Sequence, residues 1–222
     1  MDRYRREVWK ANIYLWKNGL VYGTQGNVSG IDRQKGTIYI KPSGVAYEEL
    51  TEDMIVKINI KGITLDKAGL KPSVDTPHHL FLYKSIKEIG GVCHTHSKFI
   101  TVFSVIGLPV PVLTTAHADV FGREIPVSRY VDNTGDRIGQ ELLKIYEKTG
   151  CPAIILGRHG LFAFGESPSK SAFYALMAEY CAETSYYSTI GGNLIGKKVL
   201  PLSRKEIEKW YSRYHSSRYG QK

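Results

Sequence analysis

The sequence contains few cysteines and no long apolar run. Its three cysteines, Cys93, Cys151 and Cys181, form no CxxC pair. An odd number of dispersed cysteines does not build a disulfide framework, so we expect reduced, buried thiols in a cytoplasmic protein. No stretch approaches the roughly 20 apolar residues that cross a bilayer, and the N-terminal stretch lacks the apolar core of a signal peptide. We therefore expect no membrane partner and no export.

Internal repeats, low-complexity segments and linkers are also missing. For a chain of 222 residues this predicts a single domain over residues 1–222. The formal net charge of +9 raises the question of nucleic acid. The basic residues are dispersed, however, and acidic residues interrupt them in the basic tail. We expect no nucleic-acid partner; a solvated basic surface or a small anionic substrate explains the charge.

Apolar spacing and capping residues predict alternating helices and strands. Helical spacing covers residues 2–18, 77–90, 97–107, 167–191 and 203–215, with Thr76 as the N-cap of the second segment. Strand-like patterns cover a pair of strands within 26–44, then 54–60, 91–96 and 125–131, and a second pair within 151–165. This order predicts an α/β fold with a mixed sheet flanked by helices.

Two histidines stand one residue apart in the strand-like stretch VCHTHSKF. Side chains alternate between the faces of a strand, so His94 and His96 point the same way and Cys93 points to the other face. Two imidazoles directed at one place suit Zn²⁺ or a similar cation. The same pattern also occurs as two polar residues at a strand end, and the pair alone leaves both interpretations open.

A third histidine strengthens the metal interpretation. His159 lies between glycines in GRHG, where the backbone can come close to a ligand. Three imidazoles with an open position form the arrangement of a catalytic zinc. Asp75 could add a carboxylate, and His117 is another candidate ligand. The adjacent pair His78–His79 lies inside a predicted helix and is more typical of core or surface residues.

Seven motifs occur in series along the chain, and together they carry a family resemblance. They are GNVSG, IKPSGV, KPSVDTPHH, HTHS, AHAD, GRHGLFAFG and RYGQ. In this order they resemble the class II aldolase family of metal-dependent sugar-phosphate enzymes, and its epimerase branch in particular. The resemblance extends over essentially the whole chain. It implies a three-layer α/β/α fold around a mixed, largely antiparallel sheet.

The resemblance also implies roles for individual residues. It assigns Zn²⁺, or another divalent cation such as Mn²⁺, to four ligands: Asp75, His94, His96 and His159. It assigns the substrate phosphate to seven residues: Gly26, Asn27, Lys41, Ser43, Gly44, Ser73 and Val74. Asp119 and Tyr219 match the acid/base pair of the epimerases. In that family the tyrosine comes from a neighbouring subunit of a homotetramer whose active sites lie at subunit interfaces.

The implied reaction is epimerisation of a pentulose phosphate at C4, by cleaving and re-forming the C3–C4 bond. The alternative route, transient oxidation by NAD, predicts a strand–GxGxxG–helix element that the sequence lacks. An aldolase acting on a related ketose phosphate and a non-catalytic scaffold of the same fold remain alternatives. Two residues depart from the family pattern: Val74 stands where a serine is usual, and Trp210 where we expect a histidine.

Overall fold

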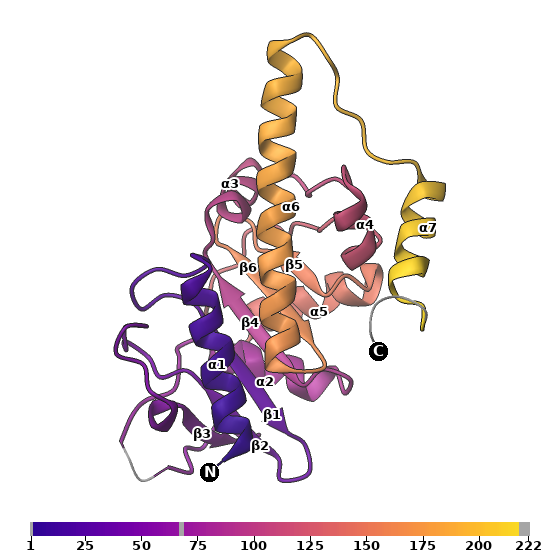
Figure 1. Ribbon diagram of the computed structural model, residues 1–222. Coiled ribbons are helices and arrows are strands. Elements are labelled where there is room, and N and C mark those ends of the chain that lie inside the picture. Colours follow the sequence, from indigo (N-terminus) through magenta and orange to yellow (C-terminus); the bar gives the residue numbers. More distant parts are fainter. Residues whose placement is uncertain (1, 67–68, 218–222) are drawn as a thin grey trace.

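The computed structural model describes residues 2–66 and 69–217. Within these ranges one sheet has six strands in the order β3-β2-β1-β4-β6-β5 (Figure 1). Along the chain the strands are β1 (Asn27–Asp32), β2 (Thr37–Ile40), β3 (Val56–Asn59), β4 (Gly91–Thr95), β5 (Ala153–Ile155) and β6 (Leu161–Gly165). All five pairs of neighbouring strands are antiparallel. The parallel component of the predicted mixed sheet is an isolated bridge between Val127 and Ile155.

Helices cover both faces of this sheet, as the three-layer prediction required. One face packs against α1 (Arg3–Lys17), α3 (Lys98–Ile106), α4 (Thr115–Phe121) and α6 (Pro168–Leu194). The other face packs against α2 (Thr76–Ser85) and α5 (Arg137–Thr149). A short 3₁₀ helix, η1 (Glu52–Met54), precedes β3, and α7 (Arg204–Tyr214) packs on α4. None of the described helices, α6 included, is long and apolar enough to cross a membrane.

Side-chain alternation along β4 decides which face the site occupies. All five residues of β4 are buried, because the strand lies inside the sheet between β1 and β6. Cys93 belongs to the core beneath α1 and α6, whereas Val92 belongs to the core beneath α2 and α5. His94 therefore faces α2, as the period of two predicts. All three cysteines are free and buried, which confirms the expectation of buried thiols.

The boundaries and existence of several elements differ from the sequence predictions. Residues 125–131 make only isolated bridges instead of the predicted strand. The second helix ends at Ser85 rather than at residue 90, and Asp75, not Thr76, occupies its N-cap position. The long helix α6 continues past Gly191 to Leu194. The helices α4 and α5 were not predicted.

The N-terminus of β4 packs directly on the N-terminus of α6, and glycine makes this contact possible. A Cβ added to Gly91 would collide with the backbone of Ser167 and Pro168. Backbone atoms cannot rotate away as a side chain can. We expect Gly91→Ala to lower the free energy of unfolding by about 1–3 kcal/mol, as overpacking does.

Chemical denaturation followed by circular dichroism measures this change. Gly191→Ala is the matched control, because nothing lies within 4 Å of a Cβ at that exposed helical position. The control should be neutral or slightly stabilising, since alanine favours helix over glycine. Equal unfolding free energies for the two variants would contradict the close approach at Gly91.

Candidate metal centre and substrate cavity

His94 lies in a row of side chains that crosses three strands. The register pairs Asn27 of β1 with His94 and pairs His94 with Phe162 of β6. All three side chains are buried. The ring of Phe162 stacks on the imidazole of His94, with centroids 4.4 Å apart and an interplanar angle of 22°. Strand pairing and ring stacking together fix the position of the first histidine.

His96 follows the end of β4 and precedes the start of α3. The N-terminus of α3 is capped by a distant carboxylate: Glu179 of α6 accepts hydrogen bonds from the backbone N–H of Phe99 and Ile100, at 2.9 and 3.0 Å. The hydroxyl of Ser97 donates to the same carboxylate at 2.6 Å and accepts no capping hydrogen bond from its own helix. This cap fixes the turn between β4 and α3, and with it the backbone that carries His96.

His159 lies in the tight turn between β5 and β6. The preceding residue, Arg158, has a φ of 59°, and its N–H donates to the carbonyl of Ser104 at 2.9 Å. A Cβ added to Gly160 would collide with the carbonyl of Thr95 and lie 2.6 Å from Cδ2 of His96. Glycine at position 160 therefore lets the turn approach the end of β4 closely enough to bring His159 beside the other two histidines.

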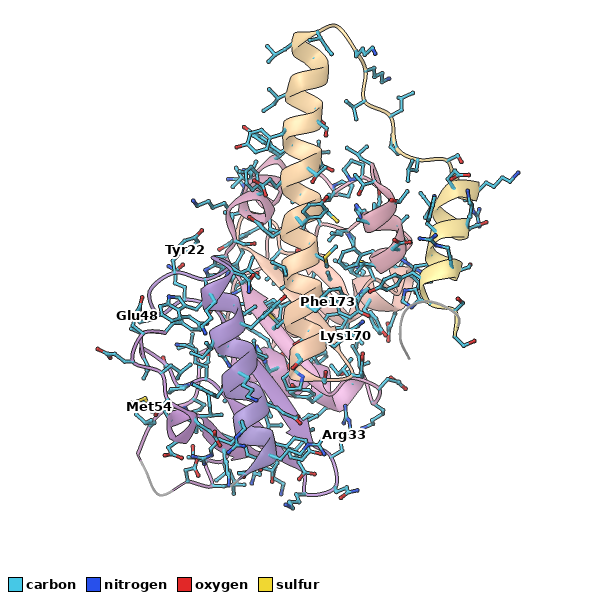
Figure 2. The ribbon with its side chains drawn as sticks, viewed as in Figure 1. Tyr22, Arg33, Glu48, Met54, Lys170 and Phe173 are labelled. Atoms are coloured by element: carbon cyan, nitrogen blue, oxygen red, sulfur yellow. The ribbon has the colours of Figure 1, made fainter. Side chains whose placement is uncertain are left out.

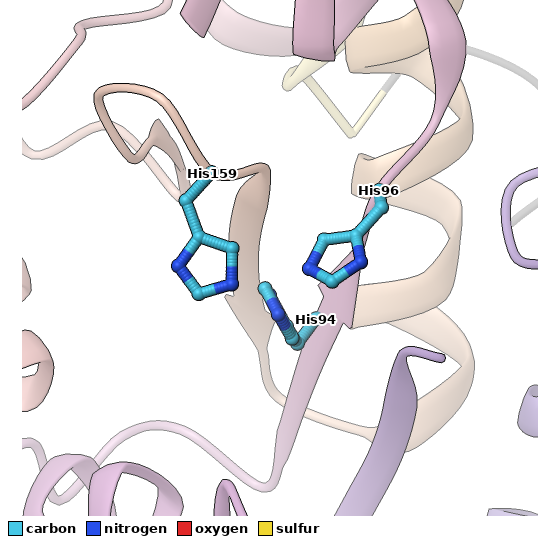
Figure 3. Close-up of side chains that lie close together, drawn as sticks. All are labelled: His94, His96 and His159. Atoms are coloured by element: carbon cyan, nitrogen blue, oxygen red, sulfur yellow. The ribbon is translucent and has the colours of Figure 1, made fainter. Parts of the chain in front are cut away.

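The three imidazoles converge on one place (Figure 3). Ring centroids lie 4.6 Å apart for His94 and His96, 4.9 Å for His94 and His159, and 5.0 Å for His96 and His159. One ligand nitrogen from each ring lies within 4.8 Å of the others. Two nitrogens bound to one zinc ion lie about 3.3 Å apart, so small ring movements suffice to bind a common ion.

The hydrogen bonds of the rings leave nitrogens free on the inside of the cluster. Nδ1 of His94 lies 2.8 Å from the carbonyl of Leu161, which requires this nitrogen to carry the proton. Nε2 of His96 is buried and has no hydrogen-bond partner among the described residues. Burial lowers the pKa of His94, His96 and His159, so all three are neutral and can donate lone pairs at neutral pH. Buried, neutral and unpaired nitrogens fit a divalent cation.

Asp75 lies beside the cluster as a separate, oriented carboxylate. Its Oδ2 accepts a hydrogen bond of 2.6 Å from the amide of Asn27. Burial disfavours the charged form, but the imidazoles of His94 and His79 and the amide of Asn27 favour it, and the net effect lowers the pKa of Asp75. The side chain does not cap α2, although Asp75 is at the N-cap position. Among the described residues, only the three histidines bring ligand atoms within 4.8 Å of one another, so the structure does not place Asp75 in the group that the sequence predicted as four ligands.

All the predicted metal and substrate-binding residues line one cavity of about 240 Å³. Its lining consists of Thr24, Gln25, Gly26, Asn27, Lys41, Pro42, Ser43, Gly44, Ser73, Val74, Asp75, His94, His96, Asn133 and His159. Backbone pairing explains how distant segments meet here. Ser43 N–H donates to the carbonyl of Lys71, and Ser73 N–H donates to that of Lys41. The cavity thus joins the histidine cluster to two facing segments that are rich in hydroxyl and N–H groups.

Lys41 contributes to the wall of the cavity in an unusual way. Its side chain is buried, and its Nζ donates to the carbonyls of Thr24, Pro42 and Val45 at 3.3, 3.4 and 2.6 Å. The ammonium also lies 4.7 Å from the centroid of the Tyr47 ring. Burial lowers the pKa of Lys41 to about 8. These contacts give Lys41 a role in holding the loops that enclose the cavity.

Four lining residues were absent from the sequence predictions: Thr24, Gln25, Pro42 and Asn133. Three of them are close neighbours of predicted residues and could have been included with them. Asn133 comes from the irregular segment between residues 131 and 136, and no local pattern connects it to the histidines. Gln25 is placed by a contact with His96, which lies 71 residues further along the chain.

Other predicted residues lie elsewhere or outside the described ranges. Asp119 is on α4 and does not line the cavity; burial raises its pKa, and the nearby charges of Arg213 and His215 offset only part of that effect. His117 donates from Nε2 to the carbonyl of Arg123 and is no part of the cluster, so the prediction that it is a candidate ligand is not supported. Tyr219 lies outside the described residues.

The pair His78–His79 belongs to the core behind the cavity. Nδ1 of His79 lies 2.7 Å from Oγ of Ser29, and the same Oγ lies 2.8 Å from the hydroxyl of Tyr83. Burial lowers the pKa of His79 to about 3, whereas a histidine in an unfolded chain titrates near 6.5. The unfolded state therefore binds more protons between these values. The contribution of neutral, buried His79 to the free energy of unfolding is therefore fully present above about pH 6.5. It is lost progressively as the pH falls from there towards 3.

We expect His79 to make the metal-free protein sensitive to acid. Between pH 7 and pH 5 its contribution to the free energy of unfolding should fall by about 2 kcal/mol. Urea unfolding at both pH values, with a chelator present, measures this difference. A His79→Gln variant should show a pH dependence smaller by that amount. An unchanged pH dependence in the variant would show that His79 is not the responsible group.

Three neutral imidazoles that could hold a divalent cation line the same cavity as segments rich in hydroxyl and backbone N–H groups. The chain belongs to the class II aldolase and adducin N-terminal domain family, whose model matches residues 6–186. The class II aldolases of this family are divalent-metal-dependent enzymes, and the histidine cluster agrees with that property.

Two kinds of relatives resemble the chain over most or all of its length. The L-ribulose-5-phosphate 4-epimerases UlaF of Salmonella paratyphi C (strain RKS4594) and Salmonella choleraesuis (strain SC-B67) are each 36% identical, over 100% of both chains. A solved L-fuculose 1-phosphate aldolase superimposes with a TM-score of 0.85 at 26% identity, covering 96% of this chain and 97% of the other. The l-fuculose-1-phosphate aldolase of Thermus thermophilus, at 21% identity and a TM-score of 0.68 over 88% of this chain and 97% of the other, shares the fold.

Proposed function

We propose that the chain is an isomerase that interconverts L-ribulose 5-phosphate and D-xylulose 5-phosphate with the help of a bound divalent cation, zinc in the first place. The observation that carries the proposal is the union, in one cavity, of the three-histidine cluster with two segments suited to a phosphate. The full-length similarity to named 4-epimerases supports the choice of substrate. With its buried free cysteines, the enzyme is suited to the reducing cytoplasm.

The chemistry explains why a metal site is needed. The hydrogen on C4 of a 2-ketose phosphate is not adjacent to the carbonyl and so is not acidic. Inversion at C4 therefore proceeds by cleaving the C3–C4 bond, turning the aldehyde fragment and re-forming the bond on its other face. His94, His96 and His159, with Asp75 beside them, would hold a divalent cation, which would supply Lewis-acid stabilisation of the negative charge that cleavage leaves on the ketose fragment.

The phosphate must be held while the aldehyde turns. Gly26 and Gly44 have φ values of 76° and 72° and present their amides without a Cβ. Ser43 and Ser73 add hydroxyl donors on facing segments. Val74 replaces the serine usual in the family, but its side chain is 71% exposed, and a backbone N–H binds phosphate whatever the side chain. This departure therefore leaves the proposed phosphate site intact.

Proton transfer at the C4 oxygen requires groups on both faces of the aldehyde. We assign these roles to Asp119 and Tyr219. Within the described part of one chain, Asp119 does not line the cavity. The proposal therefore requires a second subunit to complete each site, as in a homotetramer with active sites at the subunit interfaces.

An exposed apolar groove supports this assembly. The groove measures about 410 Å³ and lies between α3 and α6. Its lining consists of Phe103, Ile106, Leu108, Pro109, Pro111, Ser185, Tyr186, Thr189 and Ile190. Such a surface is more typical of a protein interface than of a face in contact with water. Light scattering at several protein concentrations should give the mass of four chains; the mass of one chain would contradict the shared site.

Product identification distinguishes epimerase from aldolase. Purified protein with zinc or manganese should convert L-ribulose 5-phosphate to D-xylulose 5-phosphate in a coupled assay. If only cleavage products form, the chain is an aldolase for a related ketose phosphate, an alternative that the similarity to L-fuculose 1-phosphate aldolase favours. No turnover together with no bound metal would indicate a non-catalytic scaffold, against which the three histidines argue.

A complementation experiment tests the shared site. Asp119→Asn and Tyr219→Phe subunits should each be inactive alone and retain bound metal. Mixed tetramers should recover part of the wild-type activity if the two residues of one site come from different chains. No recovery on mixing would contradict this arrangement and show that Asp119 and Tyr219 of one site come from the same chain.

A further inference from the structure

The loop between α1 and β1 brings a glutamine to the edge of the metal cluster. Tyr22, labelled in Figure 2, marks this loop beyond the end of α1. The loop starts from the core, where Leu20 and Val21 are 1% and 2% exposed. It then turns through a hydrogen bond of 3.0 Å from the N–H of Gln25 to the carbonyl of Tyr22. The side chain of Gln25 is exposed at the rim of the cavity.

The backbone on both sides of Gln25 is held by buried side chains. Lys41 Nζ donates to the carbonyl of Thr24 at 3.3 Å, and the hydroxyl of Tyr47 donates to that of Gly26 at 2.9 Å. Gly26 also packs too tightly for any side chain, because a Cβ there would lie 2.8 Å from the carbonyl oxygen of His94. Gln25 is thus an exposed residue on an anchored backbone.

The amide of Gln25 contacts the second histidine of the cluster. Its Oε1 lies 3.1 Å from Nδ1 of His96. A carbonyl oxygen only accepts, so this hydrogen bond places the ring proton on Nδ1 and leaves the lone pair on Nε2. Nε2 of His96 is buried and has no partner within residues 2–66 and 69–217. The Gln25 contact therefore holds the tautomer and the ring orientation that a metal ligand requires.

The two strand-end histidines are held by different kinds of acceptor. His94 uses the backbone carbonyl of Leu161, which no substitution removes. His96 uses a side chain, which a substitution can remove without disturbing the strand. We infer that Gln25 is a positioning residue for the metal site: it orients His96 so that Nε2 faces the ion. This inference rests on the proposed metal-dependent function.

Metal affinity tests the inference directly. Competition with a zinc-chelating dye gives the Kd for Zn²⁺ of the full-length protein. Gln25→Leu removes the hydrogen-bond acceptor of His96 and should raise the Kd for Zn²⁺ about tenfold. This is the lower end of the range seen when a residue hydrogen-bonded to a metal ligand is lost, because the contact is exposed to water. Gln25→Glu keeps an acceptor and should bind within about threefold of the wild type. Gln34→Leu, at an exposed position in the β1–β2 turn, is the matched control and should not change the Kd.

Equal affinity of Gln25→Leu and wild type would overturn the inference, as would a Gln25→Glu variant as weak as Gln25→Leu. Nitrogen chemical shifts of the histidine rings provide a second measurement on metal-free protein. They should show His96 protonated on Nδ1 in the wild type and a mixture of tautomers in Gln25→Leu. His96 protonated on Nε2 in the wild type would overturn the inference, because the contacting amide would then be a donor.

The two measurements also separate this inference from the proposed function. If the wild type binds metal but turns over no pentulose phosphate, the function fails and the effect of Gln25 on Kd still decides the inference. If the wild type binds no metal, the function and the inferred role in the metal site fail together. Loss of the Nδ1 tautomer in the variant would then show only that the hydrogen bond exists.

Discussion

Replacing His94 by asparagine is expected to abolish turnover and to weaken the binding of a divalent cation by more than about 100-fold. Loss of a residue that hydrogen-bonds a metal ligand already weakens metal affinity about 10- to 100-fold, and loss of the ligand itself weakens it further. His94 is the buried member of the cluster, and its ring centroid lies 4.6 Å from that of His96 and 4.9 Å from that of His159. Without it, the two remaining imidazoles belong to separate segments with no common strand.

Metal content per subunit and the Kd for Zn²⁺ measure this effect. His117→Asn is the informative control, because His117 is equally buried but donates to the carbonyl of Arg123 outside the cluster. The control should bind zinc as the wild type does, even if its stability falls. Zinc binding that survives in His94→Asn, or is lost equally in His117→Asn, would place the ion elsewhere.

The histidine cluster was predictable because local rules place two of its members. The strand period of two puts His94 and His96 on one side of β4, and the observed core clusters confirm that alternation at Val92 and Cys93. The glycines around His159 indicated a close approach, which Gly160 makes. Local rules could not give the distance between the segment that carries His94 and His96 and the turn that carries His159. That distance depends on the pairing of β4 with β6.

The contacts that orient the cluster were beyond prediction because they join residues far apart in the chain. Gln25 is separated from His96 by 71 residues, and Glu179 caps α3 from 80 residues beyond Phe99. Nothing in the sequence near Gln25 or Glu179 marks either residue as a partner of this site. A single sequence gives no measure of such pairs, so only the fold reveals them.

The errors in secondary structure have separate physical causes. The segment 125–131 alternates like a strand, but it makes two isolated bridges, and only the one between Val127 and Ile155 reaches a strand of the described sheet. Pro126 within the segment lacks a backbone N–H to donate to a longer ladder. The helix α5 was missed although Ile138 and Leu142, four residues apart, form its buried stripe. Leu143, Ile145 and Tyr146 of α5 pack against the same core, so the helical spacing of apolar residues was present in the sequence.

The second large effect is expected at Phe162, the aromatic residue behind the cluster. Its side chain is fully buried and contacts three imidazoles: it stacks on His94, and its ring lies edge-on to those of His78 and His79 at 6.3 and 5.7 Å. Phe162→Ala should lower the free energy of unfolding by about 3–5 kcal/mol, as other Phe→Ala changes in cores do. It should also weaken metal binding, because the space left by the phenyl ring allows the imidazole of His94 to tilt.

Phe164 separates these two effects. It lies two residues along β6 on the same face, is 1% exposed, and its ring packs against that of Tyr146 instead of a histidine of the described chain. Phe164→Ala should cost as much stability, measured by urea unfolding without metal, but should leave the Kd for Zn²⁺ unchanged. Phe162→Leu fills most of the volume and gives folded protein for the Kd measurement if the alanine variant unfolds. If both phenylalanine positions changed the Kd equally, the stacking on His94 would have no specific part in the site; a change confined to Phe162 would show that the sheet core fixes the geometry of the metal ligand.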